Sequence, residues 1–313
     1  MSVLVYIENT EGKLKKGAFE AASYASALAA KSGDSLVGVS VGNISDDELK
    51  KIGQYGVADV LQVGGENLNH QDVANALAEI AKEKGAKGIV LSNTWMGKGV
   101  GPRLAMKLGA GIVTEVVDLP EGNVVKKKAF SGKAFAQISM TKERNVLAVS
   151  PNAFGVKENV VTVNVTQAGS AGGSALKHES YNRDTSKLSL TDAELVVSAG
   201  RGLKGPENWG MIEELADTLG AATACSKPVS DADWRPHHEH VGQTGIAIAP
   251  NLYIAVGISG AIQHLAGVSS SKKIVVINTD PEAPFFKAAD YGIVGDAFEV
   301  VPKLTESIRR AKG

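Results

Sequence analysis

Apolar residues in the first half of the chain fall into short runs, separated by stretches with helical spacing. The short runs predict buried strands at residues 3–7, 36–41, 59–63 and 88–91. The stretches between them predict helices at residues 16–31, from residue 46, at 72–84 with Asp72 as the cap, and across 101–108. Strands that alternate with helices predict a parallel sheet covered by helices.

The pattern changes after residue 110, where strand signals follow one another without helices. They occupy residues 112–119, 124–130, 134–140, 146–149 and 160–165. We expect these strands to form an antiparallel extension of the same sheet or an added meander. Residues 166–184 are rich in small and polar side chains, which cannot form a core, and they predict a linker.

Strand and helix signals alternate again after the linker. Strands are expected at residues 195–199, 221–225, 252–256, 273–277 and 292–294, and helices at 206–219, 259–266 and 302–311. The predicted fold class is α/β with two domains. The N-terminal domain, residues 1–188, has a parallel sheet with an antiparallel extension, and the C-terminal domain, residues 189–313, is doubly wound.

Composition narrows the possible function classes. Hydrophobic residues make up 43% and charged residues 21%, as in a folded globular protein. The net charge of −1 provides no general field that would attract nucleic acid or an anionic membrane. Cys225 is the single cysteine, which excludes an internal disulfide and favours a reducing compartment. The N-terminal residues lack a signal-peptide pattern, and no apolar run approaches the ~20 residues of a membrane span.

Glycine and polar residues follow several strands of the second half. Glycines on either side of Arg201 would let the backbone approach a ligand there, and Arg201 is suited to a phosphate or a ring edge. The alternative is a tight turn with a solvated arginine. Residues 241–245 read VGQTG, in which Gln243, Thr244 and backbone amides either converge on a ligand or form a polar turn. The segment matches neither the Walker loop nor GxGxxG.

A third glycine-containing segment, residues 257–264, follows an apolar strand. Ser259 is expected to cap the helix there and to leave backbone amides free for an anion. Gln263 and His264 lie one turn further, within reach of a ligand at the start of the helix. His264 is either a ligand-binding residue or a core histidine.

Other polar residues lie at or between strand ends. Asn278 and Asp296 each follow a strand, where an acid either accepts a ribose hydroxyl or caps a helix. Ser226 and Lys227 follow another strand and could present a hydroxyl and a positive charge. Residues 237–240 read HHEH, but no second ligand cluster accompanies them, so no metal site is expected.

Together and in this order, these segments resemble the α subunit of electron-transfer flavoproteins. The matching stretches are residues 198–202, 241–245, 249–264 and 278–291, and the resemblance is dense from about residue 195 to 304. It is looser over the first domain, where the element order and the opening strand agree. The resemblance implies FAD as the cofactor and these binding residues: Arg201, Ser226, Lys227, Val241, Gly242, Gln243, Thr244, Ser259, Gly260, Ala261, Ile262, Gln263, His264, Asn278, Asp296 and Ala297.

The resemblance also implies where parts of FAD lie. Ser226, Gln243 and Thr244 would surround the isoalloxazine, with the Thr244 hydroxyl toward N5, and His264 would lie near the C2 carbonyl. The other implied contacts are Arg201 with the FAD, Ser259 and Gln263 with the ribityl–pyrophosphate, and Asn278 and Asp296 with the adenosine half. One position departs, because the family usually carries Ser-Arg where this chain has Ser226-Lys227. A lysine cannot lay a planar guanidinium on the flavin, so redox tuning is expected to differ.

A heterodimeric electron carrier, rather than a free-standing enzyme, is the function that the resemblance implies. Its partner would be the β subunit, which holds AMP or a second FAD. Electrons would come from flavin-dependent dehydrogenases, as in fatty acid β-oxidation, and pass to a membrane quinone oxidoreductase, with the carrier itself in a bacterial cytoplasm. From the residues alone, two alternatives stay open: an NAD- or FAD-dependent oxidoreductase on the same fold, and an adenine-nucleotide-binding module without redox function.

Overall fold

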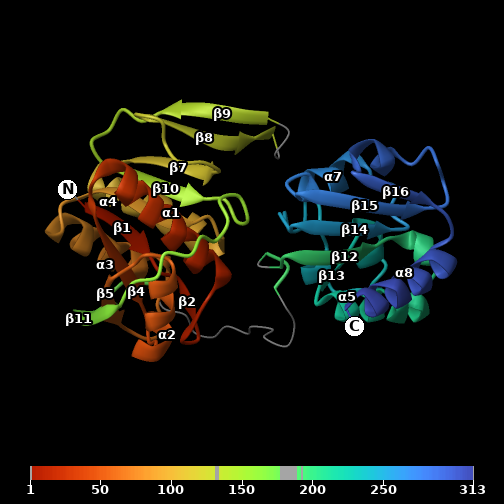
Figure 1. Ribbon diagram of the computed structural model, residues 1–313, viewed down its shortest axis with the longest axis horizontal. Helices are drawn as coiled ribbons and strands as arrows, with labels where there is room; N and C mark the ends of the chain where they lie inside the picture. The colour runs from red at the N-terminus through yellow and green to blue at the C-terminus, as the bar shows by residue number, and fades with distance from the viewer. Residues whose placement is uncertain (1, 131–133, 177–188, 192, 313) are drawn as a thin grey trace. The chain divides into compact units, whose positions relative to one another are not determined.

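The computed structural model describes residues 2–130, 134–176, 189–191 and 193–312 (Figure 1). The chain divides into two compact units, one formed by Met1–Ala129 with Ala134–Arg183 and one that includes Asp184–Gly313. Each unit has helices packed on a sheet that is wholly or largely parallel, which confirms the predicted α/β class. The predicted boundary at Ser189 adjoins residues 177–188, which lie outside the described residues, and it stays a prediction.

The first unit is built on a nine-stranded sheet with the order β11-β5-β4-β1-β6-β10-β7-β8-β9. From β11 to β7 the neighbours are parallel, and β8 and β9 pair antiparallel. The strands are β1 (Ser2–Tyr6), β4 (Ser35–Val41), β5 (Asp59–Gly64), β6 (Ala86–Ser92), β7 (Gly111–Val116), β8 (Val124–Ala129), β9 (Ala134–Ser139), β10 (Asn145–Val149) and β11 (Asn164–Ser170). A separate hairpin joins β2 (Asn9–Thr10) to β3 (Lys13–Leu14).

Helices cover both faces of this sheet. They are α1 (Lys16–Ser32), α2 (Asp46–Lys50), α3 (His70–Glu83) and α4 (Trp95–Leu108). Tyr24 of α1 belongs to one buried apolar cluster, whereas Leu77 of α3 and Leu104 of α4 belong to another. Asn69 caps α3 and Asp72 completes a capping box, so the prediction that Asp72 is the cap itself was wrong by three residues.

The strand-rich segment is antiparallel only in part. β8 and β9 form the predicted antiparallel extension, but β10 lies between β6 and β7, and β11 adds to the edge at β5, all in parallel pairings. β11 also enters the segment that was predicted to be a linker. Ladder hydrogen bonds use only the backbone, so small residues suffice for pairing there.

Residues beyond β11 are fixed by side chains of α3. The Asn69 Nδ2 donates to the Ser174 hydroxyl at 2.6 Å, and the Ser174 amide donates to the Asp72 carboxylate at 3.0 Å. The linker prediction is therefore wrong for residues 166–174. Residues 177–184 of that predicted linker lie outside the described residues.

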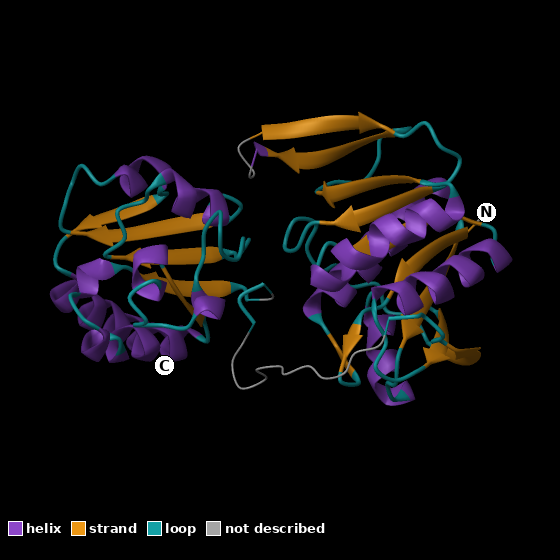
Figure 2. Cartoon of the chain, turned by 180° about the vertical axis from the view of Figure 1, so that it is seen from behind, coloured by secondary structure: helices purple, strands orange, loops and turns teal. Residues whose placement is uncertain are grey.

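The second unit contains a five-stranded parallel sheet with the order β13-β12-β14-β15-β16. The strands are β12 (Leu195–Ala199), β13 (Ala222–Cys225), β14 (Leu252–Val256), β15 (Lys273–Asn278) and β16 (Tyr291–Val294). α5 (Gly210–Leu219) and α8 (Ala297–Lys312) share one apolar cluster, and α7 (Ile262–Val268) packs in the other (Figure 2). The observed α7 therefore begins three residues after the predicted start at residue 259. The observed α8 begins five residues before the predicted start at residue 302.

The order of the strands places a switch point in this sheet. After β12 the chain forms β13 on one side and then returns to form β14 on the other. The loops that leave β12 and β14 therefore diverge and open a crevice at the carboxyl ends of the strands, which is where ligands bind in doubly wound folds. Among the helices described in either unit, none combines the length and apolarity needed to cross a bilayer.

Candidate functional site

A cleft of about 860 Å³ opens at this switch point in the second unit. Its volume lies in the range of small-molecule and cofactor sites. It is lined by Gly200, Arg201, Ser226, Lys227, Pro228, Asp231, Ala232, His240, Val241, Gly242, Gln243, Thr244, Gly257, Ile258, Ser259, Ala261, Gln263 and His264. The structure therefore brings together most of the residues that the sequence predicted for the site.

Two loops in direct backbone contact form the floor of the cleft. The Gly202 amide donates to the Gly257 carbonyl at 3.1 Å, and the Gly200 amide donates to the Val256 carbonyl at 2.9 Å. A Cβ on Gly200 would lie 2.3 Å from the Gly257 oxygen, and one on Gly257, where φ is +59°, would lie 2.9 Å from the Gly202 Cα. Glycine is required at all three positions because the backbones touch. The exposed side chain of Arg201 is left to reach a bound molecule.

The VGQTG segment is a tight turn that carries exposed side chains. Its first amide, of Val241, donates to the Cys225 carbonyl at 3.0 Å, which ties the turn to β13. The Gln243 amide donates to the Gln263 carbonyl at 2.7 Å, which ties it to α7. The segment is a polar turn that also presents Gln243 and Thr244 at the cleft, and their contact with a ligand stays a prediction.

The loop after β13 supplies charge to the cleft wall. The Ser226 amide donates to the Ala199 carbonyl at 3.1 Å, and the short helix α6 (Lys227–Ser230) follows at once. Lys227 is exposed at the start of α6, and Asp231 lies four residues on. With Arg201 on the floor, two basic side chains face one carboxylate, and a net positive charge favours phosphate.

His264 lies in the apolar wall beside the cleft. Its Nε2 is 2.8 Å from the Tyr253 hydroxyl, and Nδ1 is buried without a well-formed hydrogen bond to any described residue. Burial, with a smaller effect from His240, lowers the pKa of His264 to about 4, and the Val241 backbone opposes this shift. Burial also raises the pKa of the Tyr253 phenol, which therefore keeps its proton. A protonated phenol can donate to Nε2 or accept from it, and the imidazole tautomer decides which; in the tautomer where the phenol donates, the imidazole hydrogen lies on Nδ1.

Several lining residues were missed by the sequence analysis. They are Pro228, Asp231, Ala232, His240 and Ile258, whereas Gly200 and Gly257 lie in segments where the sequence predicted close approach of a ligand. His240 is buried, and burial lowers its pKa while the Asp231 carboxylate partly opposes that shift. Two signals pointed to these residues: His240 directly precedes the glycine turn, and Asp231 follows Lys227 at the i, i+4 spacing of neighbours on a helix.

Ser259 does not have the capping role predicted for it. α7 begins at Ile262 with Ala261 before it, and the Ser259 carbonyl instead accepts from the Phe285 amide at 3.1 Å. The prediction placed the helix too early because the turn at Gly260, where φ is +82°, separates Ser259 from the helix. The Ser259 side chain still lines the cleft.

Five predicted site residues lie outside the cleft lining, namely Gly260, Ile262, Asn278, Asp296 and Ala297. Asn278 donates from Nδ2 to the Ile258 carbonyl at 3.0 Å, and Asp296 accepts from the Phe298 amide at 3.0 Å as the N-cap of α8. Gly260 packs against Phe285, where a Cβ would lie 2.5 Å from the Phe285 Cβ. Their part in cofactor binding stays a prediction.

Two side chains of the HHEH segment, His237 and Glu239, contact protein partners. The His237 Nδ1 lies 2.7 Å from the Ser230 hydroxyl, and Glu239 pairs with Arg235. Within the residues that the structure describes, no group of three or more His, Cys, Asp or Glu side chains could hold a metal ion.

Comparison of the sequence with models of known protein families identifies the family of the chain. Residues 189–269 match the model of the electron transfer flavoprotein FAD-binding domain, and residues 3–174 match that of the electron transfer flavoprotein domain. The second match alone spans more than half of the chain. The chain belongs to the electron transfer flavoprotein α-subunit family.

Relatives in this family are similar over nearly the whole chain. Electron transfer flavoprotein subunit alpha of Bacillus subtilis (strain 168) is 35% identical, over 98% of this chain and 97% of its own length. The subunit alpha of Mycobacterium tuberculosis (strain ATCC 25618 / H37Rv) is 36% identical, over 99% of each chain. The mitochondrial subunit alpha of Dictyostelium discoideum is also 36% identical, over 99% of this chain and 92% of its own.

The residues of the cleft suit the flavin of this family. A floor without side chains at Gly200 and Gly257 allows close approach of a ligand, and Arg201 and Lys227 supply charge for a pyrophosphate. The buried Nδ1 of His264 is a polar atom that needs a partner. The lining residues of the cleft follow the carboxyl ends of three strands, β12, β13 and β14. A switch-point site requires this arrangement.

Proposed function

We propose that this chain is the FAD-binding α subunit of a heterodimeric electron carrier, completed by a β subunit. It takes electrons from flavin-dependent dehydrogenases and passes them to a membrane quinone oxidoreductase, in the cytoplasm of a bacterium. The observation that carries the proposal is the switch-point cleft, which lies largely within the residues matched to the FAD-binding domain. Bound FAD supplies the reversible electron storage, and the residues of the chain bind, orient and tune it.

Each part of the cleft has a role in this proposal. Arg201 holds the pyrophosphate, and Gln243 and Thr244 line the isoalloxazine together with Ser226. His264 donates from Nδ1 to an acceptor on the flavin, near the C2 carbonyl. A neutral donor fits this role, because burial keeps the imidazole uncharged at neutral pH.

The chemistry of the side chains supports a carrier rather than a catalyst. His264 has a pKa of about 4, which makes it a poor base at neutral pH. Burial, with the Glu239 carboxylate, raises the pKa of the Cys225 thiol to about 12, which leaves little reactive thiolate. Binding and orientation are therefore the tasks for which the described residues are suited.

We assign the adenosine half to Asn278 and Asp296, and we keep Gly260, Ile262 and Ala297 as cofactor-binding residues without a stated part of FAD. Asp296 is half-buried and uses one oxygen, Oδ1, as the cap of α8, while Lys204 lies 3.7 Å from Oδ2. A carboxylate can accept a second hydrogen bond at Oδ2 without losing the cap. A ribose hydroxyl is the donor that we propose there.

Co-expression of the full chain with its β subunit tests the proposal. We expect a one-to-one complex with flavin absorption bands, from which heat releases FAD, and which a flavin-dependent dehydrogenase reduces in the presence of its substrate. Analysis of the nucleotides that the complex releases in addition to one FAD reports whether the β subunit holds AMP or a second FAD.

Other outcomes would contradict the proposal. A colourless complex that carries only adenine nucleotide would indicate a non-redox module. Turnover of a small substrate with NAD in the absence of any dehydrogenase would indicate an oxidoreductase. A stable, flavin-loaded monomer would refute the heterodimer.

A further inference from the structure

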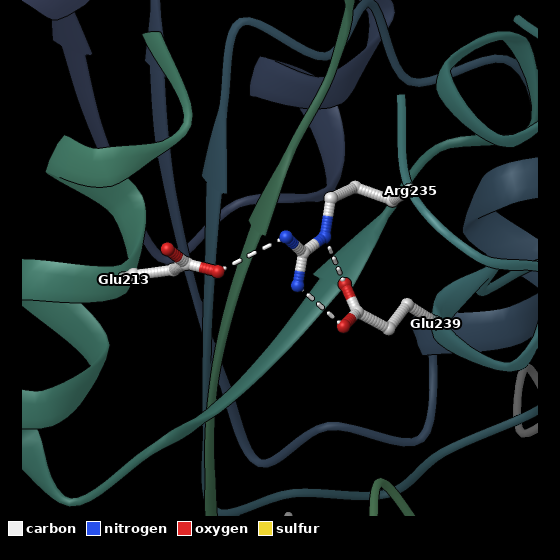
Figure 3. Close-up of polar contacts among 3 residues, drawn as sticks. All are labelled: Glu213, Arg235 and Glu239. Atoms are coloured by element: carbon white, nitrogen blue, oxygen red, sulfur yellow. Dashed lines mark hydrogen bonds and ion pairs between the residues drawn. The ribbon is translucent and has the colours of Figure 1, made fainter. Parts of the chain in front are cut away.

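A network of ion pairs holds the loop that follows β13 (Figure 3). Arg235 donates from Nε to Glu239 Oε2 at 2.7 Å and from Nη2 to Glu239 Oε1 at 2.6 Å. Its third nitrogen, Nη1, donates to Glu213 Oε1 on α5 at 3.0 Å. The guanidinium carbon also lies 5.3 Å from the centroid of the Trp209 ring. All the nitrogens of the guanidinium therefore have a partner.

This network joins the cleft wall to the core of the second unit. The loop from Ser226 to Val241 supplies seven lining residues, and the last two of them, His240 and Val241, directly precede Gly242. Glu239 directly precedes His240, so the position of its carboxylate sets where that wall begins. Through Arg235 the wall is fastened to α5, whose apolar side packs on the sheet.

The inner pair is buried and has a defined geometry. The side chain of Glu239 is 4% exposed and that of Arg235 is 15% exposed. Removing two such charges from water costs as much as their attraction returns, so buried pairs contribute little net stability compared with apolar residues. Two parallel hydrogen bonds do, however, fix the relative position of the two groups. Arg235 and Glu239 are therefore better suited to positioning than to stabilising the fold.

We propose that Arg235 and Glu239 are positioning residues for FAD binding. Neither side chain lines the cleft. They act through His240 and Val241, which they hold against the turn that presents Gln243. The inference rests on the proposed function, since it names the residues that shape the same FAD site.

The test compares single and double variants in the full chain with its β subunit. Arg235→Met leaves the buried Glu239 carboxylate without its guanidinium partner, whereas Arg235→Met combined with Glu239→Met removes both charges. The control is Arg309→Met, which breaks the Arg309–Glu214 pair to the same helix α5, at a surface site where the side chains are 57% and 54% exposed. Measurements are the Kd of added FAD by flavin fluorescence, the visible bands of bound FAD, and urea unfolding without FAD.

If the pair positions the cleft wall, the double variant should lose FAD affinity but keep its stability to urea. Both Arg235 variants should bind FAD about 10- to 100-fold more weakly, by analogy with metal sites that lose the groups orienting their metal ligands. The visible bands of bound FAD should shift in both. The double variant should nevertheless regain the wild-type urea midpoint, because the buried carboxylate is gone and Glu213, which also loses Arg235, is 45% exposed. Arg309→Met should match the wild type in all three measurements.

Two results would overturn the inference. If the double variant regains FAD affinity together with stability, the unpaired charge alone caused the loss. If wild type and both variants bind FAD equally well, the pair has no effect on the site. A wild-type complex that binds no FAD would instead overturn the proposed function, and the inference with it.

Discussion

Replacing His264 with glutamine tests whether the buried imidazole of His264 is uncharged in the folded protein. Burial lowers the pKa of His264 to about 4, from 6.5 in an exposed histidine. As pH falls below about 6.5, the unfolded chain takes up this proton before the folded chain does. Wild-type stability must then decrease with falling pH until the folded histidine titrates near 4. At 1.36 kcal/mol per pKa unit, the full loss is about 3 kcal/mol.

His264→Gln removes this pH dependence but keeps a polar partner for Tyr253. At pH 7 the variant should be less stable than wild type by about 1–2 kcal/mol, because packing around the ring is lost. Near pH 4 the wild type has lost about 3 kcal/mol and the variant none by this route. The order of stability should therefore reverse between pH 7 and pH 4.

Urea unfolding without FAD, followed by tryptophan fluorescence at pH 4, 5, 6 and 7, measures this crossing. Trp209, which is 3% exposed, reports on the second unit. Tyr253→Phe is the matched control, since it removes the hydrogen bond at Nε2 and keeps the buried histidine, so it should retain the wild-type pH dependence. A difference between wild type and His264→Gln that stays constant from pH 7 to 4 would refute the assignment of a buried, neutral histidine.

Three further predictions follow from the same unit. Lys227→Arg should retain FAD and raise its first reduction potential, because a planar guanidinium can stack on the flavin and an ammonium cannot; superimposable potentiometric titrations of the two proteins would show that position 227 does not face the flavin. Gly257→Ala should destabilise the unit to urea by about 1–3 kcal/mol through strain and the clash with Gly202, whereas Gly220→Ala, also at positive φ but in open space, should cost less. Asp296→Ala should cost about 1 kcal/mol as a lost helix cap, and an unchanged FAD affinity would exclude the proposed adenosine contact.

The elements of the second unit could be predicted from the sequence because their signals are local. Apolar runs at residues 195–199 and 252–256 coincide with β12 and β14, and their lengths suit buried parallel strands. Glycines directly after these strands indicated the cleft, since parallel strands all end at one edge of a sheet. The glycines, Arg201, Gln243 and His264 could thus be assigned to one site before any contact was known.

Helix starts were less predictable, because the same residue types serve several purposes. Asp296 at the end of a strand reads equally as a ribose acceptor or a helix cap, and the structure shows that it caps α8. Ser259 had the sequence of a cap but lies before a left-handed glycine that delays the helix. When a side chain can either cap a helix or bind a ligand, the sequence does not indicate which hydrogen bond it makes.

Strand order and buried polar partners were decided only by the tertiary structure. β10 inserts between β6 and β7, and β11 reaches the far edge of the sheet, although neither strand carries a local sign of its neighbour. Nothing in the neighbouring sequence marks Arg235 and Glu239 as partners, yet the structure buries them as a pair, with Arg235 also bound to Glu213 of α5. Periodicity and turn preferences depend on residues that are close in the sequence. The burial and pairing of a side chain depend on which distant segment of the chain packs over it.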